Sequence, residues 1–319
     1  MNPASGTPPA VRLPEPRSLF AQRARRLRVL AEAMPNLSGY LSLLATLAER
    51  QAELAHRLET GAMTGPTGPA ANWPAAGEGQ APITCDKDER QGEQNAEADR
   101  RQPPIHLETA ALAAVLGPLI KQIVHDFPAP SPAVAAALER LDLADVAATA
   151  RWMETLLSAA SNPDDVAVLP FVAAALQTLL AQRASRLDVA CVSRPSESGR
   201  CPVCGGWPLA SIRRTVGETP GLRYLHCAFC ASEWMHPRIQ CVNCGSDEQL
   251  AYYGIEGSGA AVQAETCDAC RTYLKRIDCD QSPEAEACAD DLATLGLDIL
   301  MNEQGYQRLG ANLWLQPGD

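Results

Sequence analysis

The sequence is poor in aromatic residues and has no long apolar run. Aromatic side chains make up 5% of the 319 residues. The longest apolar run, Ala110 to Ile120, is interrupted by Gly117-Pro118 and is too short to span a bilayer. The N-terminal residues also lack the basic stretch and apolar segment of a secretion signal. We therefore expect a cytoplasmic protein without membrane insertion.

An excess of positive charge is also absent. The formal net charge is -11 and the isoelectric point is about 5.0. From Cys201 to Asp319 there are eight Arg or Lys residues and sixteen Asp or Glu residues, a formal charge of -8. A protein that binds a phosphate backbone normally presents a basic face. No nucleic-acid partner is expected, and a nucleic-acid-binding zinc ribbon is the least favoured of the alternatives below.

The first two hundred residues have the Ala- and Leu-rich composition of helices, and the length allows two domains, each with its own core. Apolar residues recur at helical spacing in two parts of this half, separated by a Gly-, Pro- and charge-rich stretch that offers no core. The pattern predicts five segments: a disordered N-terminus over 1–16, a helical pair over 17–59, a low-complexity disordered insertion over 60–104, a helical bundle over 105–190, and a linker over 191–200.

The later part of the chain is organised by cysteine spacing. Eight of the twelve cysteines form four Cys-x-x-Cys pairs, with twenty-two residues between the first and second pairs and between the third and fourth. Each cysteine of the first half lies 40 positions before one of the second half, which indicates an internal duplication. Two such pairs can supply the four thiolates of a tetrahedral metal site.

The repeat predicts two metal ribbons, over 201–240 and 241–280, followed by a C-terminal helix and tail over 281–319. The expected ligands are Cys201, Cys204, Cys227 and Cys230 in site 1, and Cys241, Cys244, Cys267 and Cys270 in site 2. A cross-brace, in which alternate pairs share an ion, would break up both expected hairpins but stays open. Zinc and mononuclear iron both take tetrahedral four-sulfur geometry, so the spacing does not choose between them. No catalytic residue is expected.

Small differences between the knuckles support the duplication. Gly205 and Gly245 follow the first Cys pair of each ribbon, where a positive φ is required. The second pair of each ribbon lacks this glycine, and a hydroxyl residue, Ser232 or Thr272, stands close by. The four remaining cysteines are not expected to be ligands: Cys85, Cys191, Cys279 and Cys288.

Several longer motifs resemble the formate dehydrogenase accessory protein family, FdhE. They are CPVCGGWP, LRYLHCAFCASEW, QCVNCGS, AETCDACRTYLK, ADDLATLGLD and LWLQPGD, with weaker similarity in LFAQRARRLRVLA, YLSLLATLAERQ and PFVAAALQ. The resemblance implies an α+β fold, with an N-terminal α-helical domain, two tandem rubredoxin-like or zinc-ribbon modules and a C-terminal helix. The insertion over 60–104 departs from the family pattern without touching the metal motifs.

The resemblance further implies a function. Members are cytoplasmic maturation factors for respiratory formate dehydrogenase, not dehydrogenases themselves, and carry two rubredoxin-type iron ions in four-cysteine sites, with zinc as the alternative. The implied partner is the catalytic (selenium/molybdenum) subunit, bound before its export. A rubredoxin-like electron-transfer protein that acts on the enzyme's cofactor is the competing interpretation. The sulfurs could also serve only to staple the fold, because a closed four-thiolate site is structural by default.

Overall fold

The computed structural model describes residues 8–61, 103–105, 107–158, 162–192, 199–255 and 261–315. Nearly all of the insertion predicted over 60–104, Cys85 included, lies outside these ranges, as does most of the predicted linker. No helix within the described ranges is long and apolar enough to cross a membrane.

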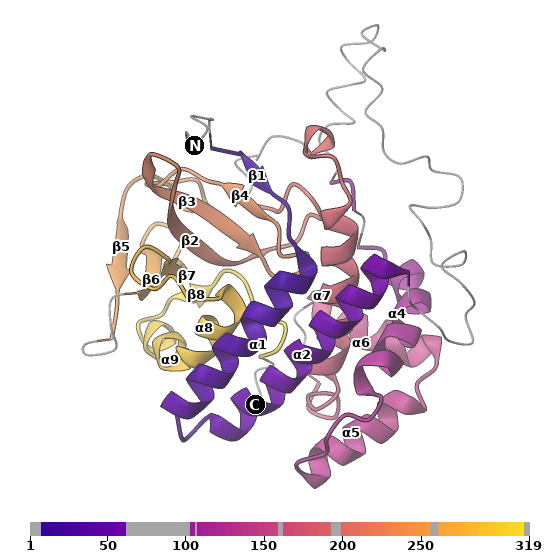
Figure 1. The fold of residues 1–319 in the computed structure, drawn as a ribbon. Helices are drawn as coiled ribbons and strands as arrows, with labels where there is room; N and C mark the ends of the chain where they lie inside the picture. The colour runs from indigo at the N-terminus through magenta and orange to yellow at the C-terminus, as the bar shows by residue number, and fades with distance from the viewer. Residues whose placement is uncertain are drawn as a thin grey trace, which may run out of the picture.

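The N-terminal half is helical, and its helices pack beside a sheet formed mainly by the C-terminal half (Figure 1). The helices of the first half are α1 (Pro16–Ala33), α2 (Ser38–Thr60), α4 (Thr109–Val124), α5 (Pro132–Asp142), α6 (Val146–Ser158) and α7 (Leu169–Ser185), followed by the short 3-10 helix η1 (Val189–Cys191). Prolines occupy the first turn of α1, α5 and α7, where the missing N–H costs no intrahelical hydrogen bond.

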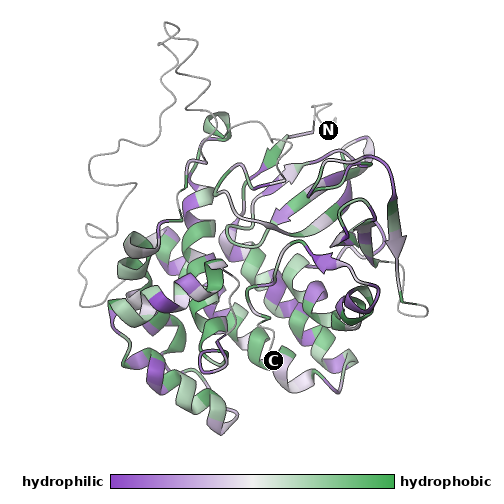
Figure 2. Ribbon diagram, turned by 180° about the vertical axis from the view of Figure 1, so that it is seen from behind, coloured by the Kyte–Doolittle hydropathy of each residue, from purple (hydrophilic) through white to green (hydrophobic). Residues whose placement is uncertain are grey.

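Helix α7 is the centre of the helical half. Fourteen of its seventeen residues are buried, and apolar residues occur all round it. A helix of this kind needs partners on every side. It packs against α1, α2, α4 and α6, and the hydropathy colouring shows green stretches along these packed helices (Figure 2).

The C-terminal half supplies seven strands of one eight-stranded sheet, whose order is β1-β4-β3-β2-β7-β6-β5, with β8 paired to β7. The strands are β1 (Val11–Arg12), β2 (Pro208–Val216), β3 (Thr219–Cys227), β4 (Glu233–Met235), β5 (Leu250–Tyr253), β6 (Val262–Cys267), β7 (Thr272–Asp278) and β8 (Gln307–Arg308). Strands β2–β4 form the first ribbon and β5–β7 the second. Parallel pairing of β2 with β7, with Ile212 opposite Ile277, joins the two ribbons.

The N-terminal segment contradicts one expectation. Disorder was predicted over 1–16, but Val11 and Arg12 pair with Trp234 and Glu233 as strand β1. Two further hydrogen bonds hold this segment, from Met235 N to Ala10 O at 2.8 Å and from the Tyr224 hydroxyl to Pro9 O at 2.9 Å. Because β4 would otherwise expose an unpaired edge, pairing with a Pro- and Ala-rich segment satisfies backbone groups that composition alone does not reveal.

The C-terminal region forms two short helices, α8 (Ala287–Ala293) and α9 (Leu295–Glu303), instead of one continuous helix. The break lies at Thr294, where the buried ammonium of Lys275 on β7 binds the carbonyl oxygens of Asp291 at 2.8 Å and Thr294 at 3.0 Å. These carbonyls are among the groups that a helix end leaves without an intrahelical partner. Lys275, a residue of the sheet, therefore caps the C-terminal end of α8.

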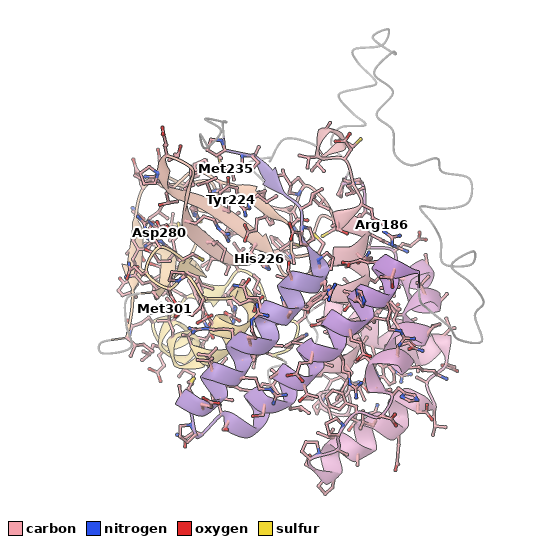
Figure 3. All side chains as sticks on the ribbon, in the orientation of Figure 1. Arg186, Tyr224, His226, Met235, Asp280 and Met301 are labelled. Carbon is pink, nitrogen blue, oxygen red and sulfur yellow. The ribbon has the colours of Figure 1, made fainter. Side chains whose placement is uncertain are left out.

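The sequence predicts one hydrophobic core for the helices and another for the ribbons, but the structure divides its cores differently. One continuous core joins α1, α2, α4, α7 and α8 to the first ribbon and contains all four cysteines of site 1. A second, smaller cluster lies between the second ribbon and α9, and Met301 on α9 is labelled in Figure 3. Its members are Ala264, Tyr273, Leu297, Met301 and Tyr306. The first ribbon is thus part of the helical domain's core.

Candidate metal centres

Site 1 brings together the four cysteines predicted for it. The Sγ atoms of Cys201 and Cys230 are 3.6 Å apart, and those of Cys204 and Cys227 are 3.5 Å apart. All four sulfurs lie within 4.8 Å of one another. A metal–sulfur bond of about 2.3 Å gives a tetrahedron with edges of roughly 3.8 Å. The arrangement therefore fits a four-thiolate metal ion.

Site 2 repeats this geometry. The Sγ atoms of Cys241 and Cys270 are 3.6 Å apart, and those of Cys244 and Cys267 are 3.7 Å apart. Sequential Cys pairs share each cluster, so the structure adopts this pairing and not the cross-brace. Within the described ranges, these two clusters are the groups of three or more His, Cys, Asp or Glu side chains that could hold an ion.

Tight backbone turns place the sulfurs. Gly205 and Gly245 follow the first knuckles with φ of 73° and 74°, as the sequence predicts. Each donates its N–H to the carbonyl of the first cysteine of its knuckle, at 2.8 and 3.0 Å. Ala231 and Arg271 occupy the same left-handed region after the second knuckles, with φ of 57° and 54°. Residues other than glycine rarely adopt this region, so the backbone is strained after the second knuckle of each ribbon. The sequence alone does not reveal this strain.

The two sites differ in exposure. All four site 1 cysteines are buried, whereas in site 2 Cys244 is exposed and Cys270 is half-buried. Helix α7 covers site 1, because Gln177 donates a hydrogen bond of 2.8 Å to the carbonyl oxygen of Ala228, inside the second knuckle. Nothing in the spacing of Gln177 and the cysteines predicts this contact.

A buried polar chain fixes Gln177. Its side-chain oxygen accepts a 3.1 Å hydrogen bond from Arg23 on α1, which also pairs with Glu286 at 3.0 Å. Both charged side chains are nearly inaccessible to solvent. Glu286 in turn caps α8 by accepting from the N–H of Ala289 at 2.8 Å. Helices α1, α7 and α8 thus meet the metal knuckle through a single hydrogen-bonded chain.

The thiols of each cluster differ in acidity. Burial alone would raise the pKa of Cys270, but hydrogen bonds from Thr272 and Asn243 lower it to about 6. The pKa of Cys230 is likewise lowered, against the effect of burial, by neighbouring thiols and Ser232. Burial raises the pKa of Cys241 to about 12. One thiol in each site therefore has a lowered pKa, and the positive charge of a bound ion would favour deprotonation of the others.

The cysteines outside the pairs that the structure describes are not in these clusters. Cys288 is fully buried on α8, and its Sγ donates to Asn312 Oδ1 at 3.5 Å. Cys279 is half-buried directly after β7. The complete burial of Cys288 is consistent with a packing role.

Gly206 leaves no room for a side chain beside site 1. A Cβ there would lie 2.5 Å from Phe229 Cδ2 and 3.3 Å from the sulfurs of Cys204 and Cys227. We expect Gly206→Ser to destabilise the fold by about 1–3 kcal/mol, because overpacking strains its surroundings, and to weaken metal binding at site 1. Chelator competition and thermal unfolding measure the two effects.

The second ribbon offers a matched control. Ser246 occupies the position 40 residues later, so site 2 already tolerates the side chain that Gly206→Ser introduces. Ser246→Gly removes two exposed hydrogen bonds of 3.2 Å, in which the serine hydroxyl donates to the carbonyl oxygen of Glu248 and accepts from its N–H. It should leave metal binding at both sites nearly unchanged. Equal losses in the two variants would contradict the steric explanation.

Comparison of the whole chain with known proteins identifies the same family. Residues 8–197 match the model of the FdhE N-terminal region, 200–238 that of the FdhE central domain, and 239–315 that of the FdhE C-terminal domain. The chain belongs to the FdhE family. Protein FdhE homologs of Pseudomonas aeruginosa and Stutzerimonas stutzeri are 35% and 34% identical to it, over 99% of this chain and 95% of each relative.

A solved FdhE structure has the same fold. The crystal structure of the FdhE protein from Pseudomonas aeruginosa superposes with a TM-score of 0.78 at 33% identity, covering 98% of this chain and 100% of that one. Protein FdhE of Salmonella paratyphi B is 32% identical over 98% of this chain and 92% of its own length. The α+β architecture expected for the FdhE family, with helices first and the cysteine ribbons after them, is therefore confirmed.

Proposed function

We propose that this FdhE protein is an accessory factor required for the assembly or activation of respiratory formate dehydrogenase and is not itself an enzyme. It binds the catalytic (selenium/molybdenum) subunit in the cytoplasm before that subunit is exported. The family membership supports this role. So does the donor set, because four thiolates leave no open coordination position for a substrate.

We propose different roles for the two metal sites because they differ in exposure. Site 1 is enclosed by the main core and by α7, so its metal holds the fold together. Site 2 lies at the surface with Cys244 exposed, so its metal shapes a face that a client protein can reach. The eight paired cysteines are the proposed ligands, with iron in both sites and zinc as the alternative.

Client capture tests this role. Catalytic subunit should co-purify with the wild-type protein from cells that produce formate dehydrogenase. Cys244→Ala removes an exposed ligand of site 2, and we expect it to capture several-fold less catalytic subunit and to lower formate dehydrogenase activity in those cells. Cys201→Ala should lose capture as well, through unfolding, which makes Cys244→Ala the informative variant.

Cys279→Ala is the matched control, since this half-buried cysteine follows the second ribbon without joining either cluster. It should capture as much catalytic subunit as the wild type. Normal capture and normal formate dehydrogenase activity with folded Cys244→Ala would sink the proposed role of site 2. Absence of any capture by the wild type would sink the proposed partner.

Electron transfer to the enzyme's cofactor is the second candidate, and the exposure of Cys244 and Cys270 at site 2 favours it. An iron ion there would lie close to solvent and to a docked redox partner. Electron transfer requires iron with a reversible visible absorbance change, whereas zinc has no redox chemistry. Metal analysis and a visible spectrum of anaerobically purified protein decide between the two, because a colourless, zinc-only protein excludes electron transfer.

A further inference from the structure

A cavity of about 190 Å3 opens between the two ribbons, away from both cysteine clusters. Its wall contains four arginines, one tyrosine and one glutamate: Arg213, Arg223, Arg238, Arg276, Tyr252 and Glu265. Four guanidinium groups around one small cavity are unexpected in a region with a formal charge of -8. Neither metal site accounts for them.

Strand pairing gathers these side chains on one face of the sheet. Arg213 on β2 lies directly opposite Arg223 on β3, and across the parallel seam Arg276 on β7 lies opposite Ser211. Directly paired residues point to the same face, and so do residues two apart on one strand. The arginines therefore converge because β2 and β7 join the two ribbons, a contact that neither ribbon has alone.

Carboxylates hold three of the guanidinium groups in position. Arg213 pairs with Asp278 at 2.9 Å and with Asp280 at 3.1 Å. Asp280 is labelled in Figure 3, on the side of the sheet away from α4–α7. Arg223 pairs with Glu265, and Arg276 approaches Asp278 at 3.6 Å. These pairs fix the groups in advance, so a ligand need not order them.

Two features leave the cavity able to accept a ligand. Arg238 is exposed and donates to the carbonyl of Pro220, with no carboxylate at ion-pair distance among the residues that the structure describes. Gly221 keeps the cavity open, since a Cβ there would lie 3.1 Å from Nη2 of Arg213. Among the residues that the structure describes, four guanidinium groups are matched by three carboxylates, Glu265, Asp278 and Asp280, which leaves these groups with an excess positive charge.

We propose that this cavity is an anion site that binds the phosphate group of a small molecule. Guanidinium groups match the oxygens of a phosphate in planar, two-pronged hydrogen bonds. The volume suits one such group, since a cavity of roughly 150 Å3 holds a benzene molecule. The acidic surroundings would repel a long polyanion such as a nucleic acid. A carboxylate shares the oxyanion chemistry and is separated from phosphate by the test.

Calorimetric titration of inorganic phosphate into the metal-loaded full-length protein tests the proposal. Arg238→Gln and Arg276→Gln each remove one charged donor, and we expect roughly tenfold or greater weakening from each, because hydrogen bonds between charged groups are the strong ones. Arg28→Gln is the matched control: it also removes one positive charge, from an exposed pair with Glu49 on the helices. It should bind phosphate within about twofold of the wild type.

Sodium acetate provides the second arm of the titration. Binding of phosphate but not acetate, lost in the two cavity variants, supports the proposal. Acetate binding as tight as phosphate would assign the cavity to carboxylates and overturn it. So would phosphate binding that is absent from the wild type or unchanged in both cavity variants. Circular dichroism and metal content show that the variants remain folded, and none of these outcomes depends on the proposed role in formate dehydrogenase assembly.

Discussion

Cys230→Ala is expected to unfold most of the protein, whereas Cys270→Ala, the same change 40 residues later, should leave the helical domain folded. Site 1 lies within the main core, and the binding free energy of a structural metal ion is folding free energy, about 10–16 kcal/mol in zinc fingers. A typical domain has only about 5–15 kcal/mol of stability in total. Loss of the first ion therefore removes as much stability as the domain has.

The second site should behave differently because its ligands are less enclosed: Cys244 is exposed and Cys270 is half-buried. Its ribbon packs on β2 through β7, and on α9 through the small cluster around Tyr273 and Met301. Losing this ion should disorder that ribbon locally and leave the melting of α1, α2 and α7 intact. Thermal unfolding followed by circular dichroism, with metal content measured in parallel, checks both variants. Equal loss of helical signal from the two would show that the ribbons are energetically one unit.

Lys275→Met is expected to destabilise the protein by about 3–5 kcal/mol, the cost of removing one partner from a buried charge pair. The Lys275 ammonium is fully buried, 3.2 Å from Asp291 Oδ1 and 2.6 Å from Asp298 Oδ2. It also binds the two carbonyls at the end of α8. Methionine has a similar length and stands at the equivalent position of the first ribbon, Met235, so the change tests charge more than volume.

The same substitution should alter the response to acid. Burial alone would raise the pKa of Asp291, but Arg308 and Lys275 lower it below its ordinary value. A carboxyl whose pKa is depressed by folding contributes stability above its unfolded pKa, and that stability is lost as the pH falls through the folded value. Without Lys275 the folded pKa rises, so acid unfolding should begin at a higher pH. Urea unfolding measured at successive pH values checks this, with Arg28→Gln expected to match the wild type.

The local parts of the fold were accessible from the sequence. The repeated cysteine spacing predicted which four sulfurs meet. Gly205 and Gly245 predicted where the chain turns with positive φ, since the conformation of a tight turn depends on residues close in the sequence. Helical periodicity predicted that the first half of the chain is helical. These features are determined locally, by backbone sterics and by the repeat of apolar side chains.

Contacts between segments that are distant in the sequence could not be predicted from it. The two-residue strand β1 has a composition that predicts disorder, and it becomes a strand only because β4 offers an unpaired edge. The break between α8 and α9 depends on Lys275, a residue of the sheet. Three of the cavity's arginines lie on separate strands and Arg238 follows β4, and no motif in the chain marks them as neighbours.

By itself, the sequence determined two duplicated four-cysteine clusters, a helical first half and the resemblance to the FdhE family. The tertiary structure decided that the two copies are unequal. The main core and the packing of α7 on the first ribbon enclose site 1, whereas Cys244 of site 2 is exposed. A repeat in sequence fixes the geometry inside each module, but burial depends on what each module packs against, and only the folded chain supplies those neighbours.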